Sequence, residues 1–288
     1  MSAIKKILVS GSNGQLGSEL KELSIRTNDF RFIFLSREEL SISDPVALKN
    51  IFELERPSFF INCAAYTAVD KAETEKEIAE EINGKAVGAI ASLCNEYGCK
   101  LIHISTDYVF NGQGNTPLKE DDPVDPINTY GATKLSGERL AMLYTDPVII
   151  RTSWVYSAYG NNFVKTMKRL MGEKESLGIV SDQVGSPTYA ADLAEAIMEI
   201  IRSGKWEPGI YNYSNNGVIS WFEFASEIKK QLHSTCEVKP ISTAQFPTPA
   251  KRPSYSVLDK TKIQSVYHIS TRDWKESLQE CIGKLLAN

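Results

Sequence analysis

The chain has 288 residues, 42% of them hydrophobic, and a formal net charge of −4. This suits one large α/β unit, or a core domain with a smaller one, and allows a sizeable buried core. No basic block or acidic tail is present, so we expect no nucleic-acid partner. No apolar run reaches the roughly 18 residues of a membrane span. Glycines interrupt the N-terminal residues before a signal-peptide core can form, so we expect a cytoplasmic protein without a membrane anchor.

The five cysteines show no CxxC spacing, and the three histidines form no HxH or HExxH pattern. We therefore expect reduced thiols, as in a cytosolic protein, and no metal site.

Short apolar runs alternate with amphipathic stretches through the first half of the chain. The runs are near-continuous, which is typical of parallel strands that helices cover on both faces. The predicted strands are 5–11, 31–36, 58–65, 100–105 and 147–153, and the predicted helices are 14–24, 45–55, 75–97 and a segment around Tyr130. Asp44 suits the N-cap of the second helix, with Pro45 at its first position. The pattern predicts an α/β fold with a doubly wound parallel sheet.

After about Trp154 this rhythm loosens, and short strands stand between turn-rich loops. Helices are predicted at 161–171, 190–204, 220–232 and 271–286, and strands at 176–180, 209–214 and 237–241. We predict a cofactor domain over 1–155 and a smaller mixed α/β substrate domain mainly over 156–288. The segments at about 177–203 could return to the first domain.

Gly11, Gly14 and Gly17 lie three residues apart, directly after the first strand and at the start of a helix. In a dinucleotide site, such glycines permit a sharp bend, admit a pyrophosphate close to the backbone, and let helix and strand pack closely. The spacing is GxxGxxG, not the usual GxGxxG. The alternative is a tight turn without a ligand. We assign the turn to cofactor binding, together with Asn13, Gln15 and Leu16.

The end of the second strand bears on the choice of cofactor. An NAD site often carries Asp or Glu there, on the ribose 2′-hydroxyl, whereas this chain has Ser36 and Arg37. These residues suit a 2′-phosphate, so we expect NADPH to be favoured while NADH remains usable. The alternative for Arg37 is a solvated loop charge. The remaining residues expected at the cofactor are Ser41, Ile42, Ala64, Ala65, Tyr66, Thr67, Tyr130 and Lys134.

Thr106 and Asp107 end the fourth strand, where the edge of a parallel sheet exposes functional groups. Tyr130 follows, with Lys134 one helical turn later, and no other tyrosine has a lysine four residues on. An ammonium beside a phenol lowers its pKa from about 10 towards the working pH. We therefore predict Tyr130, Lys134 and Thr106 as catalytic residues, with Thr106 hydrogen-bonding a substrate carbonyl. The alternative is an ordinary helix-surface pair.

The stretches SGSNGQLG, CAAYTAVDKAE, STDYVFNGQG, YGATKLSGE, DQVGSPTY and FPTPAKRPSYSVLD resemble the extended short-chain dehydrogenase/reductases. Within that group they resemble the dTDP-4-dehydrorhamnose reductase family, over nearly the whole chain. The resemblance implies a Rossmann-like first domain, a nucleotide-sugar-binding second domain, and NAD(P)H as hydride donor. It implies reduction of the C4 ketone of dTDP-4-dehydro-6-deoxy-L-mannose, with Tyr130 donating the proton and Lys134 assisting.

The resemblance also implies sugar contacts from Thr106, Asp107, Tyr130 and Trp154, although Trp154 could equally be a core aromatic. Asn162 and Arg252 are candidates for phosphate contacts, with solvent-facing loop residues as the alternative. Some members of the family dimerise through Mg2+ bound by glutamates. Those glutamates are not mapped onto this chain, and we predict no metal and either a monomer or a homodimer.

Two other functions stay open. One is a reductase of a related dTDP- or UDP-linked 4-keto sugar with a different stereochemical outcome at C4. The other is a non-catalytic NADP-binding regulatory subunit of the same fold, of the kind that accompanies methionine adenosyltransferase. The presence of Thr106, Tyr130 and Lys134 together favours an enzyme.

Overall fold

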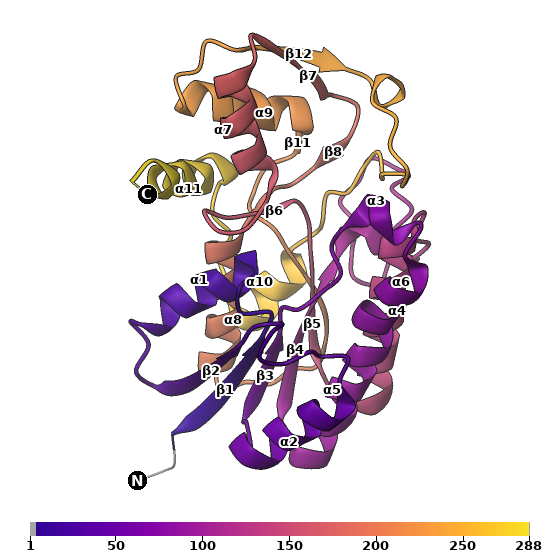
Figure 1. Ribbon diagram of the computed structural model, residues 1–288, viewed down its shortest axis with the longest axis vertical. Helices are drawn as coiled ribbons and strands as arrows, with labels where there is room; N and C mark the ends of the chain where they lie inside the picture. The colour runs from indigo at the N-terminus through magenta and orange to yellow at the C-terminus, as the bar shows by residue number, and fades with distance from the viewer. Residues whose placement is uncertain (1–3, 288) are drawn as a thin grey trace.

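The computed structural model describes residues 4–287. At its centre lies a six-stranded sheet in the order β10-β5-β4-β3-β1-β2, in which all neighbouring strands are parallel (Figure 1). Its strands are β1 (Lys5–Ser10), β2 (Phe30–Leu35), β3 (Phe59–Asn62), β4 (Lys100–Thr106), β5 (Val148–Thr152) and β10 (Gly209–Tyr213). The prediction of a doubly wound parallel sheet is confirmed, with β10 as an additional edge strand from the second half of the chain.

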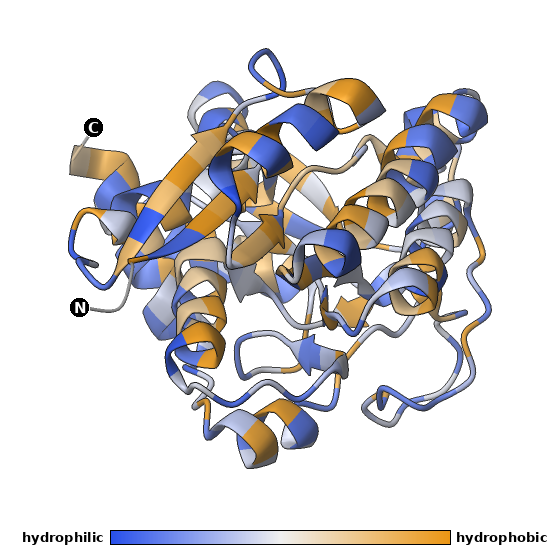
Figure 2. Ribbon diagram, turned by 90° about the horizontal axis from the view of Figure 1, so that it is seen from below, coloured by the Kyte–Doolittle hydropathy of each residue, from blue (hydrophilic) through white to orange (hydrophobic). Residues whose placement is uncertain are grey.

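Helices cover both faces of this sheet (Figure 1). One face packs against α1 (Gln15–Ser24), α8 (Ala190–Arg202) and α10 (Thr261–Tyr267). The other face packs against α2 (Pro45–Glu55), α5 (Ala86–Tyr97) and α6 (Thr129–Tyr144). Figure 2 shows strands that are mainly hydrophobic beside helices of mixed character, as expected when only one side of each helix is buried. Helix α8 therefore belongs to the packing of the main sheet, while the predicted domain boundaries stay a prediction.

The second helix begins as its sequence predicts. Asp44 accepts hydrogen bonds from the backbone N–H groups of Val46 and Ala47, and Pro45 occupies the first turn. This arrangement satisfies two of the backbone donors that a helix start leaves unpaired.

The stretch predicted as one helix over 75–97 is interrupted. It consists of α4 (Lys76–Glu80), a π-helical turn (Glu81–Lys85) and α5. The π turn holds Asn83, whose side chain clamps the loop after β3 to α6 by bonding both backbone groups of Tyr66 and the hydroxyl of Thr133. The π turn adds one residue to the helical repeat, in agreement with the five-residue apolar spacing from Ile82 to Val87.

A second layer stands above the carboxyl ends of the strands (Figure 1). It contains α7 (Phe163–Glu173), α9 (Trp221–Gln231) and α11 (Trp274–Ala287) around a separate apolar core. Three small two-stranded sheets join it: β6 (Val155–Tyr156) with β9 (Thr188–Tyr189), β7 (Ser176–Val180) with β12 (Glu237–Ile241), and β8 (Val184–Gly185) with β11 (Ile219–Ser220). A short helix α3 (Val69–Ala72) follows β3. Within residues 4–287, no helix combines the length and apolar character that crossing a membrane requires.

Candidate active site

A cavity of about 1490 Å³ runs along the carboxyl ends of β1, β3 and β4 and reaches the start of α9. Most of the residues predicted for the site line it: Gly11, Gly14, Gln15, Leu16, Arg37, Ser41, Ile42, Ala64, Ala65, Tyr66, Thr67, Thr106, Asp107, Tyr130, Lys134 and Trp154. Five do not: Asn13, Gly17, Ser36, Asn162 and Arg252. The structure thus brings the three predicted catalytic residues and most of the predicted cofactor residues to one cavity.

The glycine turn at one end of this cavity is shaped for close approach. Gly11 has a φ of +68°, and a Cβ there would lie 2.7 Å from the backbone nitrogen of Ala64. Gly17 packs against Gly11 and Ser12 so tightly that a side chain would overlap their backbone. Gly14 is the N-cap of α1, and no side chain within residues 4–287 hydrogen-bonds the first N–H groups of this helix. Such a helix start fits the pyrophosphate of a dinucleotide.

Ser36 and Arg37 differ in their availability to a cofactor. Ser36 is engaged with Glu39: its backbone N–H donates to that carboxylate at 2.8 Å, and its hydroxyl accepts from the Glu39 N–H. Arg37 is exposed, lines the cavity and makes no ion pair within residues 4–287. The free guanidinium is therefore the group that suits a 2′-phosphate, while Ser36 shapes the turn.

Thr106, Asp107 and Tyr130 converge where β4 ends. The Thr106 hydroxyl donates to Asp107 Oδ1 at 3.0 Å and lies within hydrogen-bonding reach of the Tyr130 phenol. Asp107 Oδ2 is buried and makes no hydrogen bond of normal geometry with any described residue. Burial raises the pKa of Asp107 to about 7, against the opposing influence of the Ser256 and Thr106 hydroxyls. A buried carboxyl with a free oxygen at a cavity wall is suited to binding a hydroxyl-rich ligand.

The protonation of Tyr130 differs from the sequence-based expectation. Burial raises its pKa to about 12, with a smaller effect from Asp107 in the same direction and an opposing one from Thr106. Lys134, which was expected to lower this pKa, directs its ammonium to the backbone oxygen of Ile104 at 2.6 Å. In this structure burial outweighs the lysine, so Tyr130 stays a protonated phenol and a potential proton donor.

Lys134 itself is almost completely buried. Burial lowers its pKa to about 8, while Glu138 and Cys63 act in the opposite direction. Its Nζ lies 3.4 Å from Nε2 of the buried His103, a neighbour that the local sequence around Lys134 does not indicate. The lysine is therefore held by two groups of β4, the Ile104 carbonyl and the His103 ring, and it also lines the cavity.

Trp154 stacks on Trp221 at the far end of the cavity. The ring centroids lie 3.6 Å apart with an interplanar angle of 13°. Trp154 adopts a φ of +47°, which is strained for a residue with a side chain, and Gly185 leaves room for its indole. Trp221 also lines the cavity and was missed, because nothing in its local sequence distinguishes it from a core aromatic of α9.

The two predicted phosphate ligands have partners of their own. Asn162 caps α7: its side chain accepts from the Lys165 N–H and donates to the Ser157 carbonyl. Arg252 forms a two-pronged ion pair with Asp70. Their contacts with a nucleotide stay predictions.

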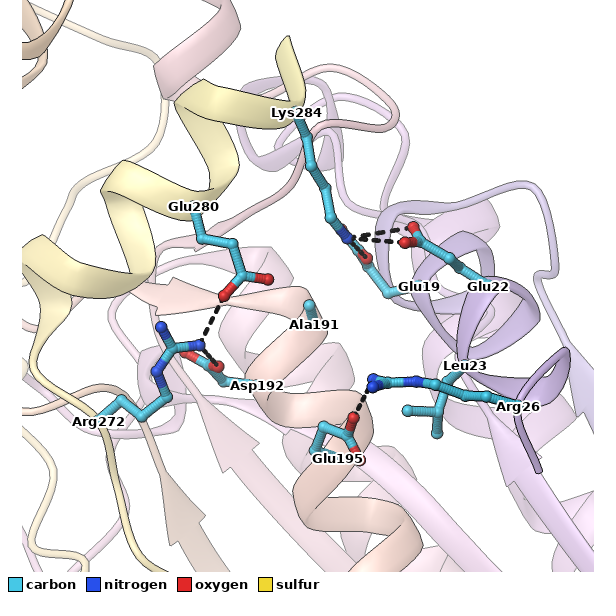
Figure 3. Close-up of a pocket in the computed structure, with 10 residues that line it drawn as sticks. All are labelled: Glu19, Glu22, Leu23, Arg26, Ala191, Asp192, Glu195, Arg272, Glu280 and Lys284. Atoms are coloured by element: carbon cyan, nitrogen blue, oxygen red, sulfur yellow. Dashed lines mark hydrogen bonds and ion pairs between the residues drawn. The ribbon is translucent and has the colours of Figure 1, made fainter. Parts of the chain in front are cut away.

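A separate pocket of about 230 Å³ lies between α1, α8 and α11 (Figure 3). Its carboxylates face cations: Lys284 contacts Glu19 and Glu22, Arg272 contacts Asp192 and Glu280, and Arg26 contacts Glu195. Among the described residues, no three His, Cys, Asp or Glu side chains are grouped to hold a metal ion. The expectation of no metal stays a prediction.

Comparisons with known proteins agree with this geometry. The family described as RmlD substrate binding domain matches residues 5–287. The chain is 42% identical over 276 residues to the spore coat polysaccharide biosynthesis protein SpsK of Bacillus subtilis, covering 96% of each chain. It is 38% identical over 285 residues to dTDP-4-dehydrorhamnose reductase of Aggregatibacter actinomycetemcomitans, covering 95% of this chain and 97% of that one.

Solved structures extend the likeness to the fold. A dTDP-4-dehydrorhamnose reductase from Clostridium acetobutylicum has a TM-score of 0.94 at 39% identity, covering 98% of this chain and 99% of that one. The enzyme from Bacillus anthracis in complex with NADP has a TM-score of 0.93 at 37% identity, covering 97% and 99%. The chain therefore belongs to the dTDP-4-dehydrorhamnose reductase family and is an NAD(P)-dependent reductase of nucleotide sugars.

Proposed function

We propose that the protein reduces the C4 ketone of dTDP-4-dehydro-6-deoxy-L-mannose to give dTDP-L-rhamnose, with NADPH favoured over NADH. The observation that carries this proposal is the convergence of Thr106, Asp107, Tyr130 and Lys134 in the cavity that also contains the glycine turn. The names of the relatives supply the substrate, since several are dTDP-4-dehydrorhamnose reductases.

The reduction needs a hydride at C4 and a proton at the ketone oxygen. The bound nicotinamide cofactor supplies the hydride and is oxidised. Tyr130 donates its phenolic proton to that oxygen as negative charge develops on it. A pKa of about 12 keeps Tyr130 protonated through the neutral range, and the growing basicity of the oxygen drives the transfer.

The neighbours of Tyr130 orient the ketone. Thr106, whose hydroxyl donates to Asp107 Oδ1 in this structure, can turn that proton to the same oxygen and so fix the angle at which the Tyr130 proton arrives. Asp107 offers its free Oδ2 to a sugar hydroxyl beside C4. Lys134 lines the same cavity and is our candidate for the cofactor ribose.

The walls of the cavity support the rest of the assignment. Arg37 lines the cavity and is our candidate for the 2′-phosphate that distinguishes NADPH from NADH. The Trp154–Trp221 stack provides a flat apolar wall for the sugar or its base. Arg252 remains our candidate for the diphosphate, as does Asn162, although neither lines the cavity in this structure.

The test is to incubate the purified protein with the 4-keto sugar nucleotide and NADPH, follow NADPH absorbance, and identify the product by NMR. We expect NADPH oxidation and a rhamnose-configured product. A talose-configured product would instead support the reductase of opposite C4 stereochemistry. Binding of NADPH without any oxidation would support the regulatory-subunit function.

A further inference from the structure

Four buried polar side chains, Ser10, Asn62, His103 and Lys134, form a row that meets the cavity at Lys134. Ser10, Asn62 and His103 occupy matching register positions on β1, β3 and β4, so their side chains lie side by side on one face of the sheet. Ser10 Oγ lies 2.8 Å from Asn62 Oδ1, Asn62 Nδ2 lies 3.1 Å from His103 Nδ1, and His103 Nε2 lies 3.4 Å from Lys134 Nζ. None is more than 2% exposed. The row therefore links the strand before the glycine turn to the proposed catalytic lysine.

The row has a direction. The Ser10 hydroxyl donates to Asn62 Oδ1, which places the amide nitrogen of Asn62, a pure donor, against His103 Nδ1. Nδ1 must then accept, so a neutral imidazole carries its proton on Nε2, facing Lys134. An ammonium has no lone pair to accept that proton, whereas a neutral amine does. In this direction the row stabilises Lys134 as an amine.

The opposite direction is chemically complete as well. If the Asn62 amide turns over, its nitrogen donates to Ser10 and its oxygen accepts a proton from His103 Nδ1. Nε2 is then free to accept an N–H of Lys134, which the ammonium and the amine can both donate. The ammonium therefore fits only this second direction, whereas the first direction fits only the amine.

The charges around the row leave the amine and ammonium forms of Lys134 close in free energy near neutral pH. Burial, followed by the charge of Lys134, holds the pKa of His103 well below its usual value, so the ring is neutral. Glu138 and Cys63 favour the Lys134 ammonium, but burial outweighs them and brings the lysine pKa to about 8. Glu138 is itself paired with Arg151 at 2.7 Å, and Tyr130 lies one turn away on α6 as a neutral phenol.

We propose that His103 is a positioning residue for Lys134, and that the Ser10–Asn62–His103 row decides through its hydrogen-bond direction whether Lys134 meets cofactor and Tyr130 as an amine or an ammonium. The proposal rests on the role given to Lys134 in the proposed function. It assigns a role to three buried polar side chains that hydrogen-bond one another beside the lysine.

The decisive variant is Asn62→Asp, which keeps the shape of the side chain but can only accept. The introduced carboxylate would draw the His103 proton to Nδ1, leave Nε2 as an acceptor, and stabilise the Lys134 ammonium. We expect the titration midpoint of Lys134 to rise by about one pH unit or more. The midpoint is measured from the 13Cε chemical shift in protein labelled with 13C-lysine, with the Lys134 signal assigned by its loss in Lys134→Met. This readout does not depend on turnover.

A carboxylate also acts through space, so a double-mutant cycle provides the control. In a His103→Leu background the row is broken, and Asn62→Asp should lose most of its effect on Lys134. In a His103→Gln background the amide can still donate to the introduced carboxylate and accept from Lys134, so the effect should persist. An equal rise with His103 intact and in the His103→Leu background would overturn the proposal, as would no rise in Asn62→Asp itself.

If Asn62→Asp does not fold, as judged by circular dichroism and thermal melting, Ser10→Ala replaces it. That change removes the donor that fixes the Asn62 amide, so the Lys134 midpoint should rise by a smaller amount; an unchanged midpoint would overturn the proposal.

The alkaline limb of the kcat–pH profile should move with the Lys134 midpoint. If the Lys134 midpoint moves but no sugar is reduced, the proposed role of the row is supported and the proposed substrate is wrong. If the sugar is reduced but the Lys134 midpoint does not move, the proposed role of the row is wrong and the proposed substrate is supported.

Discussion

Both carboxylate oxygens of Asp70 hold the guanidinium of Arg252, at 2.6 and 2.7 Å. Asp70 also accepts from the backbone N–H of Ala250, and its pKa is lowered chiefly by the bond to Arg252. This pair ties the loop around Arg252 to helix α3, close to the cavity. It fixes the direction of an arginine that we assign to the substrate diphosphate.

We predict that Asp70→Asn raises the KM for the nucleotide sugar about tenfold, because one charged partner of the guanidinium is lost. The KM for NADPH should stay unchanged. Arg252→Lys should have a similar effect, since an ammonium cannot make the two-pronged bond. If Asp70→Asn lowers the KM instead, then Asp70 competes with the diphosphate for Arg252 rather than orienting it. Initial rates against each substrate separate these results.

Removing the phenol should abolish most turnover. Tyr130→Phe should lower kcat by roughly 10²- to 10⁴-fold because the proton donor is lost, while the NADPH dissociation constant changes little. The T-shaped contact with Tyr108 does not need the hydroxyl, so the fold should be retained. Turnover near the wild-type rate in a folded Tyr130→Phe protein would show that another group donates the proton.

The buried charge of Lys134 should cost stability. Its folded-state pKa of about 8 lies below the ordinary lysine value, so the unfolded chain binds more protons between these values and stability rises with pH through that window. Lys134→Met removes this cost and should stabilise the protein by roughly 2–4 kcal/mol below pH 8. The gain should fade as the pH approaches 10.5. Urea unfolding at several pH values checks this, and a pH-independent difference would contradict it.

The indole stack should act on the nucleotide sugar and not on the cofactor. Trp221→Ala removes the stacking partner of Trp154 and should raise the KM for the nucleotide sugar about three- to tenfold. Trp221→Phe keeps an aromatic ring and should raise this KM less. Trp206→Phe is the matched control, because Trp206 packs against Phe59 at the other end of the sheet. An equal effect from both tryptophans would indicate general destabilisation.

Arg37 should decide the choice between the two cofactors. Arg37→Ala should raise the KM for NADPH about tenfold and leave that for NADH nearly unchanged, because only NADPH carries the 2′-phosphate. Arg139→Ala, at an exposed arginine of α6, should change neither. Equal changes in the KM for NADPH and for NADH would show that Arg37 does not bind the 2′-phosphate.

The sequence was informative wherever a function depends on neighbours in the chain. The bend at Gly11 needs a residue that tolerates positive φ, and Tyr130 and Lys134 are one helical turn apart, so both patterns are local. The near-continuous apolar runs likewise predict a parallel sheet, because each strand must be buried on both faces. These signals determined the fold class and the two ends of the candidate site.

Only the tertiary structure decided the relationships between distant segments. It placed Asn62 and His103 behind Lys134, Trp221 on Trp154, and Asp70 on Arg252. It also reversed the expected pKa direction of Tyr130, because burial depends on everything that packs around a group and no local pattern encodes it. The sequence by itself determined which chemical groups are available, and packing determined which of them meet and in which protonation state.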